Sequence, residues 1–124
     1  MKLLLDTHAV LWWVRDDRRL KPAARKAIAT ADVVWVSAAT AFEVAIKVSQ
    51  SRLRIREPLH VTVAADDFTE LVVTMKHTEE LERLPYHHRD PFDRLLVAQA
   101  RVEGATIVTH DRALEPYGVP MIWT

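Results

Sequence analysis

Apolar runs of four or five residues recur along the chain, separated by longer stretches of helix-forming composition. These runs predict strands at Lys2–Asp6, Val33–Val36, Leu71–Thr74 and Thr106–Thr109, and a fifth at Pro120–Trp123. Because the runs are continuously apolar rather than alternating, they are typical of strands in a parallel sheet that helices cover on both faces.

The stretches between these runs predict helices over Ala9–Val14, Ala23–Ala31, Ala38 to about Gln50, Val61–Asp67, Thr78–Leu84 and Pro91–Glu103. Several boundaries have a local cause, since Ser37 and Asp90 are good N-cap residues and Gly104 ends the last helix. No linker, repeat or change in composition divides the chain. We therefore expect a single domain over residues 1–124, of the α/β class, with three layers (α/β/α) and a central, mostly parallel sheet of four to five strands.

Composition narrows the possible classes of function. A chain of 124 residues with 49% hydrophobic residues is long enough for a real core. Its two glycines, Gly104 and Gly118, exclude the GxGxxG and GxxxxGK[ST] nucleotide-binding motifs. The absence of Cys excludes disulfides and thiolate chemistry. No apolar run approaches the ~20 residues of a membrane span, so we expect a cytoplasmic protein without a membrane partner.

The charges balance overall, at 17 Lys and Arg against 17 Asp and Glu, so net charge indicates no nucleic-acid partner. Basic residues do gather between Arg15 and Lys26 and again between Arg52 and Arg56. Such groups can meet phosphates, but alone they are more typical of solvated helix and loop faces.

Four carboxylates stand where a parallel sheet would place its ligands, which bind beyond the carboxyl ends of the strands. Asp6 and Asp111 come just after predicted strands, and Glu43 and Asp93 lie on predicted helices. Each has a structural explanation as well. Asp6 and Asp111 can end a strand or cap a helix, Glu43 has Lys47 at i+4, and Asp93 lies in the first turn of a helix.

Considered together, these residues (hereafter the four acids) predict a metal site, because a pocket of carboxylates repels itself unless a cation neutralises it. Oxygen ligands favour Mg²⁺ or Mn²⁺ over zinc, and such an ion activates water for displacement at phosphorus. The acids therefore predict nuclease chemistry. Replacing any one of them is expected to relieve repulsion and stabilise the metal-free protein. Another metal-dependent phosphoesterase or a DNA nuclease is an alternative.

A known family shares this order of motifs. The set LLLDTH, then Glu43, then HRDPFDRLLVAQA, then VTHD resembles PIN-domain ribonucleases, and more closely the VapC toxins of bacterial VapBC toxin–antitoxin systems. The similarity runs nearly from end to end. It implies a PIN-like fold and a Mg²⁺- or Mn²⁺-dependent endoribonuclease that inhibits translation. By this resemblance the four acids are the metal ligands and catalytic residues, and Thr7 and Thr109 are supporting hydroxyls.

The same resemblance implies the partners of the protein. The RNA substrate would be a tRNA or a ribosomal RNA loop, cut to leave 5′-phosphate and 3′-hydroxyl ends. A cognate VapB-like antitoxin would block the site, and the toxin would form a homodimer. A non-catalytic PIN-like RNA-binding module is a further alternative, although the intact set of acids argues against it.

Residues next to the predicted site leave some questions open. Arg89 and Arg94 are candidate contacts to RNA phosphate, and Arg94 has the alternative of pairing with Asp90. We interpret His87 and His88 as a solvated loop. The neighbouring residues Trp12 and Trp13 must face different directions, so either one of them lies at a partner surface or both pack against the core. Their order along the chain does not decide between these two arrangements.

Overall fold

The apolar runs form strands and the stretches between them form helices in the computed structural model, which describes residues 1–124. The strands are β1 (Lys2–Leu5), β2 (Val33–Ser37), β3 (Thr69–Leu71), β4 (Thr106–Thr109) and β5 (Met121–Trp123). The helices are α1 (Thr7–Val14), α2 (Pro22–Thr30), α3 (Ala38–Ser49), α4 (Leu59–Ala65), α5 (Met75–Arg83), α6 (Pro91–Glu103) and the 3₁₀ helix η1 (Arg112–Tyr117).

All five strands are parallel, in the order β3-β2-β1-β4-β5. Strand β1 is central, and its Leu4 pairs with Trp35 of β2 on one side and with Ile107 of β4 on the other. The chain first adds β2 and β3 on one side of β1, and then crosses back to add β4 and β5 on the other side. The prediction of an α/β fold with a parallel central sheet is therefore confirmed, and the sheet is wholly parallel.

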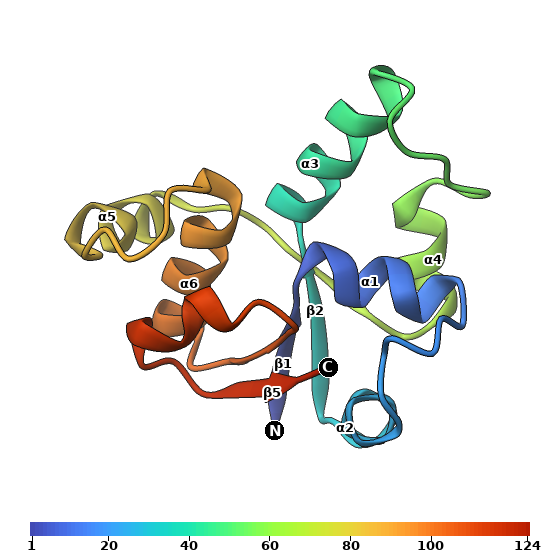
Figure 1. The fold of residues 1–124 in the computed structure, drawn as a ribbon, viewed down its shortest axis with the longest axis horizontal. Coiled ribbons are helices and arrows are strands. Elements are labelled where there is room, and N and C mark those ends of the chain that lie inside the picture. Colours follow the sequence, from blue (N-terminus) through green and yellow to red (C-terminus); the bar gives the residue numbers. More distant parts are fainter.

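Successive side chains of β1 enter two different cores, because neighbouring residues of a strand point to opposite faces. Leu3 and Leu5 pack with residues of α1 and α2, whereas Leu4 packs with residues of α6 and η1. Figure 1 shows this arrangement, with α1, α2 and α4 on one side of the sheet and α5 and α6 on the other. The three layers predicted from the sequence are present.

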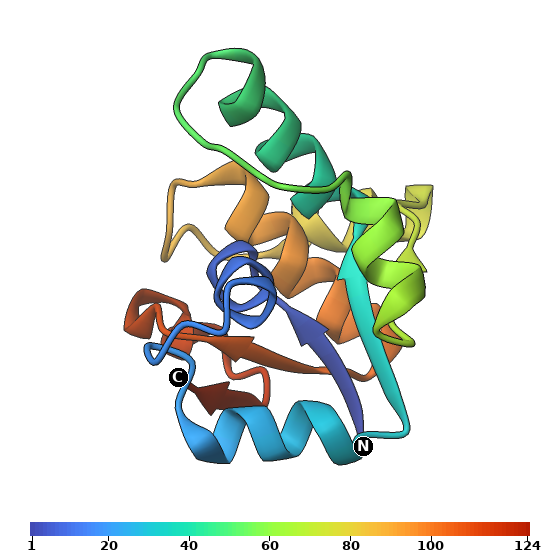
Figure 2. The same cartoon turned by 90° about the vertical axis from the view of Figure 1, so that its right-hand side faces the viewer.

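The carboxyl ends of β1, β2 and β4 lie at one edge of the sheet, because the strands are parallel. Helix α3 starts directly after β2 and rises beyond this edge (Figures 1 and 2). Ser37 caps α3 by accepting a hydrogen bond from the Ala39 amide at 3.0 Å. Its hydroxyl also donates to Oε1 of Gln99 on α6 at 2.6 Å, so a buried bond joins the sheet edge to α6. This edge carries the residues discussed below.

One strand lies earlier in the chain than predicted. The expected strand Leu71–Thr74 is instead Thr69–Leu71, and the following valines are exposed, Val72 at 57% and Val73 at 39%. Thr74 cannot continue the strand because its side chain accepts a hydrogen bond from the His77 amide and caps α5. The strand already ends at Leu71, because its only neighbour, β2, ends at the paired residue Ser37 and continues as α3.

Helix α4 runs over Leu59–Ala65 and α5 over Met75–Arg83, so each begins two to three residues before its predicted start. Both tryptophans of α1 pack against the core. Trp12 is buried, at 7% exposed, and Trp13 is partly buried against Phe68, with ring centroids 5.6 Å apart. No helix has the length and apolar character that crossing a membrane requires.

Candidate metal centre

Asp6 lies at the sheet edge because β1 ends at Leu5 and α1 begins at Thr7. The Asp6 carboxylate caps α1 by accepting a hydrogen bond from the Ala9 amide at 2.8 Å. Only 4% of the residue is exposed. Burial raises the pKa of Asp6, against the lowering effects of hydrogen bonds from Thr109 and Ala9 and of the neighbouring His8 and His110. A buried carboxylate of this kind favours either a proton or a bound cation.

Thr109, the last residue of β4, is fully buried and connects two of the acids. Its hydroxyl oxygen accepts a hydrogen bond from the Asp111 amide at 3.0 Å. Its side chain also hydrogen-bonds Asp6, which lowers the pKa of that carboxyl. Thr109 thus holds the loop after β4 against the start of α1.

His88 forms the centre of the site, although sequence reasoning placed it in a solvated loop. Its Nε2 lies 3.0 Å from Oδ2 of Asp111 and 3.4 Å from Oδ2 of Asp93. Its Nδ1 accepts a hydrogen bond from the Asp90 amide at 3.0 Å, and its own amide donates to the Tyr117 hydroxyl at 3.1 Å. Because Nδ1 is an acceptor here, Nε2 carries the proton that the two carboxylates share.

The pKa of Asp93 is strongly raised. The residue lies in the first turn of α6, which Asp90 caps through hydrogen bonds from the Phe92 and Asp93 amides, at 2.8 and 3.3 Å. Burial and the negative charges of Asp90, Asp6 and Asp111 raise the pKa of Asp93 to about 7, against the lowering effect of His88. Burial and the negative neighbours both disfavour the charged form of Asp93, and a bound cation would favour it.

Asp111 differs from Asp93 in its balance of charge. Burial acts to raise its pKa, but hydrogen bonds from the Ala113 amide and from His88 outweigh burial and hold the pKa below its usual value. The Ala113 bond, at 3.0 Å, also makes Asp111 the N-cap of η1. Asp111 consequently remains ionised while it faces the same imidazole as Asp93.

Glu43 lies on α3, and its carboxylate has two partners of its own. Its Oε1 accepts a hydrogen bond from the Thr7 hydroxyl at 2.5 Å, and its Oε2 lies 3.2 Å from Nζ of Lys47, the i+4 pair expected from the sequence. Because Thr7 directly follows Asp6, its hydroxyl ties α3 to the carboxyl end of β1. The structure therefore places Glu43 next to Thr7, but it does not bring Glu43 into the group formed by His88, Asp93 and Asp111.

The donor set fits a hard divalent cation. Of the four acids, only Asp93 and Asp111 belong to the group whose ligand atoms lie within 4.8 Å of one another. The third member of that group is His88, whose Nε2–H orients the two carboxylates. The charge of Asp6 acts on Asp93, and Glu43 is held beside Asp6 by Thr7. Carboxylate oxygens are the ligands that Mg²⁺ and Mn²⁺ prefer, and the raised pKa of Asp93 indicates the excess negative charge that such an ion would neutralise.

The two arginines singled out from the sequence have different surroundings. Arg94 is 5% exposed, donates to the Leu84 carbonyl at 3.0 Å and stacks over Tyr86, with the guanidinium 3.9 Å from the ring centroid. It is engaged inside the protein and does not pair with Asp90. Arg89 is exposed and lines a cavity of about 460 Å³ together with Glu43, Lys47 and Arg52. Of these two arginines, only Arg89 is accessible to a ligand.

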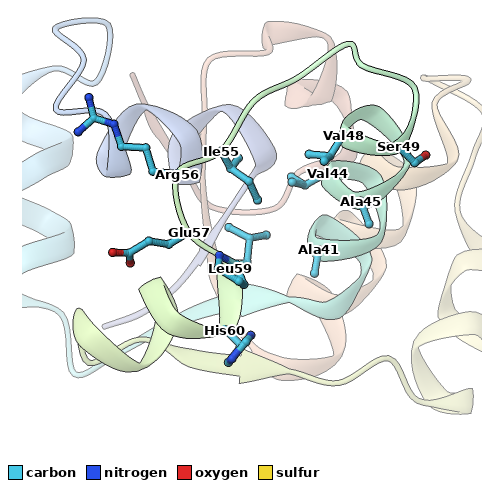
Figure 3. Close-up of a pocket in the computed structure, with 11 residues that line it drawn as sticks. Ala41, Val44, Ala45, Val48, Ser49, Ile55, Arg56, Glu57, Leu59 and His60 are labelled. Carbon is cyan, nitrogen blue, oxygen red and sulfur yellow. The ribbon is translucent and has the colours of Figure 1, made fainter.

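A separate cavity of about 630 Å³ lies between α3, α4 and the loop that joins them (Figure 3). Figure 3 shows Ile55 and Leu59 facing Val44 and Val48 across it, while Arg56 and Glu57 point away. None of the four acids lines this cavity. Its surface is mainly apolar and offers no chemistry for hydrolysis.

The fold and the acidic site together match one protein family. The PIN domain family matches residues 3–119, which is nearly the whole chain. The chain therefore belongs to the PIN-domain family. Its central parallel sheet is the fold that the sequence resemblance implied.

Individual relatives narrow the class further. The chain is 33% identical over 121 residues to Ribonuclease VapC22 of Mycobacterium tuberculosis, an alignment that covers 95% of this chain and 93% of that protein. Within its family, the chain is a VapC-type ribonuclease, the toxin class of VapBC toxin–antitoxin systems.

Solved structures share the fold at lower identity. VapBC2 of Rickettsia felis, bound to a DNA fragment from its promoter, has a TM-score of 0.78 at 15% identity and covers 100% of this chain and 99% of that chain. The DNA-bound VapBC of Salmonella typhimurium has a TM-score of 0.74 at 16% identity, with 98% and 97% covered. Both similarities extend over essentially the full fold.

Proposed function

We propose that this protein hydrolyses RNA phosphodiester bonds with Mg²⁺ or Mn²⁺ as cofactor and acts as an endoribonuclease toxin. The residues proposed to hold the ion and carry the chemistry are Asp6, Glu43, Asp93 and Asp111. The observation that supports this most directly is the raised pKa of Asp93, to about 7, within a group of carboxylates at the carboxyl edge of the sheet. We propose further that residues 1–124 act as a single PIN-like domain.

Each part of the site has a distinct task in this proposal. A bound divalent ion would supply activation of water and neutralisation of charge on the phosphate. Asp93 and Asp6 provide negative charge that the protein leaves largely uncompensated. His88 orients the carboxylates of Asp93 and Asp111 through its Nε2–H. Thr7 orients Glu43, and no side chain is required to act as a separate general base.

The cavity beside Glu43 supports a phosphate-containing substrate. Its lining contains the cations Lys47, Arg52 and Arg89 and the acids Glu43 and Asp90. Lys47 is paired with Glu43, so Arg52 and Arg89 are the cations available to a phosphate. Phosphates adjacent to the cleaved bond can lie along these cations, since phosphate contacts supply much of nucleic-acid affinity. We therefore retain Arg89 as a proposed RNA contact. Arg94 is left out because its guanidinium bonds the Leu84 carbonyl inside the protein.

The partners follow from the relatives. Because similar folds occur in VapBC assemblies, we propose a VapB-like antitoxin as the protein partner and a homodimer as the form of the toxin itself. The RNA substrate is proposed to be a tRNA or a ribosomal RNA loop in the cytoplasm. Co-expression of a small reading frame directly upstream of the gene should relieve growth arrest if that frame encodes the antitoxin.

Asp93→Asn tests the proposed chemistry directly. Purified wild-type and Asp93→Asn proteins are incubated with total cellular RNA in Mg²⁺, Mn²⁺ or EDTA, and the new ends are mapped. We expect discrete fragments with 5′-phosphate ends from wild type with metal only. The variant should be slower by roughly 10²–10³-fold, the usual loss when one electrostatic contribution to a transition state is removed. Equal fragments from the variant, or in EDTA, would contradict the metal-nuclease mechanism.

A further inference from the structure

Three rings pack together beside the acidic site and have no task in the mechanism above. The ring centroids of His8 and His110 lie 4.6 Å apart, with the ring planes 81° from parallel. Trp12 lies 5.6 Å from His8 and 5.1 Å from His110. His8 and Trp12 are one turn apart on α1, and His110 is in the loop after β4. We call these residues the ring cluster.

The ring cluster is buried on one side and open on the other. Trp12 is 7% exposed and belongs to the hydrophobic core, whereas His8 and His110 are both exposed. The guanidinium of Arg19 lies 5.0 Å from the centroid of the Trp12 ring. Two exposed rings therefore rest on a rigid aromatic support, with a cation at its border.

The position of the ring cluster connects it to the reaction. His8 follows Asp6 by two residues, and His110 directly precedes Asp111, so both rings flank acids of the site. A substrate phosphate at the acids would place the adjoining nucleotide close to these rings. The two histidines are outside the group of side chains whose ligand atoms converge for a metal, so a second metal site does not explain them.

Aromatic rings of this kind bind nucleobases by stacking or edge contacts. A base inside a duplex has both faces covered by its neighbours, so only an unpaired base that is turned out of the stack can use them. The exposed imidazoles also carry ring nitrogens that can donate to or accept from a base edge. The chemistry of the ring cluster therefore favours a base over a phosphate.

We propose that His8 and His110 form a binding site for one unpaired nucleobase of the RNA substrate, beside the phosphate held at the four acids. This inference rests on the proposed ribonuclease function and makes it more specific. The substrate is then single-stranded or looped RNA with a base turned outward, and double-stranded RNA is excluded from this site.

Fluorescence of a base analogue tests the site without cleavage. The protein carries Asp93→Asn and is held in Mg²⁺, and the probe is a short oligouridylate with one 2-aminopurine, used alone or paired with its complement. His110→Phe keeps a ring and His110→Leu keeps apolar packing without one, while His8→Ala removes the other ring. His60→Ala is the control, because His60 is an exposed histidine on α4 outside the ring cluster.

We expect the parent protein, His110→Phe and His60→Ala to bind the single strand and quench the analogue. His110→Leu and His8→Ala should bind the single strand about tenfold more weakly and lose the quenching, and binding of the duplex should not change. Thermal unfolding of each variant verifies that it is folded. Unchanged quenching in His110→Leu and His8→Ala, equal losses for duplex and single strand, or no single-strand binding by the parent would overturn the base site.

Failure of this inference is distinguishable from failure of the proposed function. The same His8→Ala and His110→Leu changes, made in the protein with Asp93 intact, are tested on cellular RNA. If they cut at the wild-type rate, the base site is overturned and the ribonuclease proposal stands. If wild-type protein shows no metal-dependent cleavage, the ribonuclease proposal is overturned first.

Discussion

Asp93 and Glu43 are both acids of one site, yet their surroundings differ. Asp93 shares the single Nε2–H of His88 with Asp111, whereas Glu43 has the Thr7 hydroxyl on one oxygen and the Lys47 ammonium on the other. We call the first group, His88, Asp93 and Asp111, the His88 half. The second group, Thr7, Glu43 and Lys47, is the Thr7 half.

This difference between the two halves indicates which of them depends on a bound cation. In the His88 half, burial and the negative charges of Asp90, Asp6 and Asp111 raise the pKa of Asp93 to about 7. In the Thr7 half the carboxylate already has partners and is oriented before any ion arrives. The His88 half should therefore respond strongly to metal and pH, and the Thr7 half should respond mainly to changes in geometry.

The largest expected effect is on the stability of the metal-free protein. The pKa of Asp93 is raised from its ordinary value of 3.8 to about 7, so between these values the folded state holds a proton that the unfolded state has lost. Stability should fall as pH rises through this window, by on the order of 2–4 kcal/mol. Asp93→Asn should remove this fall and be the more stable protein at pH 8. Urea unfolding in EDTA at several pH values measures it.

Two observations would break this prediction. One is an equal dependence of stability on pH in wild type and Asp93→Asn, and the other is a variant less stable than wild type at pH 8.

Asp111 provides a contrast, because its pKa is lowered and its charge stabilises the fold. The sequence-based expectation that removing any of the acids stabilises the metal-free protein is thus narrowed, and Asp111→Asn should lower stability.

The next effect concerns metal affinity. His88→Ala removes the donor that orients two proposed ligands, and loss of such an orienting partner typically weakens metal binding by about 10–100-fold. Calorimetric titration with Mn²⁺ measures this directly, with His60→Ala as the matched control. Wild-type affinity in His88→Ala would show that the His88 half is ordered by other contacts.

A smaller effect is expected in the Thr7 half. Thr7→Val keeps the shape of the side chain but removes the hydroxyl that donates to Glu43, a bond to a charged group worth roughly 1.5–3 kcal/mol. Because Lys47 still holds Glu43, we expect about a tenfold loss of RNA cleavage, with metal affinity changed less than in His88→Ala. Thr7→Ser should restore the wild-type rate. A rate for Thr7→Val equal to wild type would remove Thr7 from the site.

The smallest effect should come from Lys47→Met, which removes the ion pair and keeps the apolar stem. Helical i,i+4 pairs contribute only about 0.3–0.5 kcal/mol, so thermal unfolding should change little. A loss of several kcal/mol would mean that Glu43 depends on Lys47 rather than on Thr7, and would reverse the roles given to these two partners.

Much of the fold was predictable because local signals coincide with it. Ser37 and Asp90 cap α3 and α6 as predicted from their residue types, and Gly104 ends α6 with a positive φ of 67°. The apolar runs identified the central strands. Strand β3 was misplaced, because Val72 and Val73 look like core residues by type but lie exposed after the strand has ended.

The candidate site was predictable in its acids and not in its histidine. The acids follow strands or lie on helices next to them, so topology brings them to one edge. His88 gave no such signal, since its place between Asp93 and Asp111 depends on how its loop folds back onto Tyr117. The position of Arg94 in the sequence was misleading. Arg94 directly follows Asp93, but successive residues of a helix are rotated by about 100°, so its side chain enters the core.

The outer strands of the sheet have one more consequence. Strands β3 and β5 are each only three residues long, so both borders of the sheet expose little unpaired backbone. Short borders resist edge-to-edge pairing and the aggregation that follows from it. Two copies of this protein should consequently meet through their helices, because neither border has enough length to continue the sheet into a neighbour.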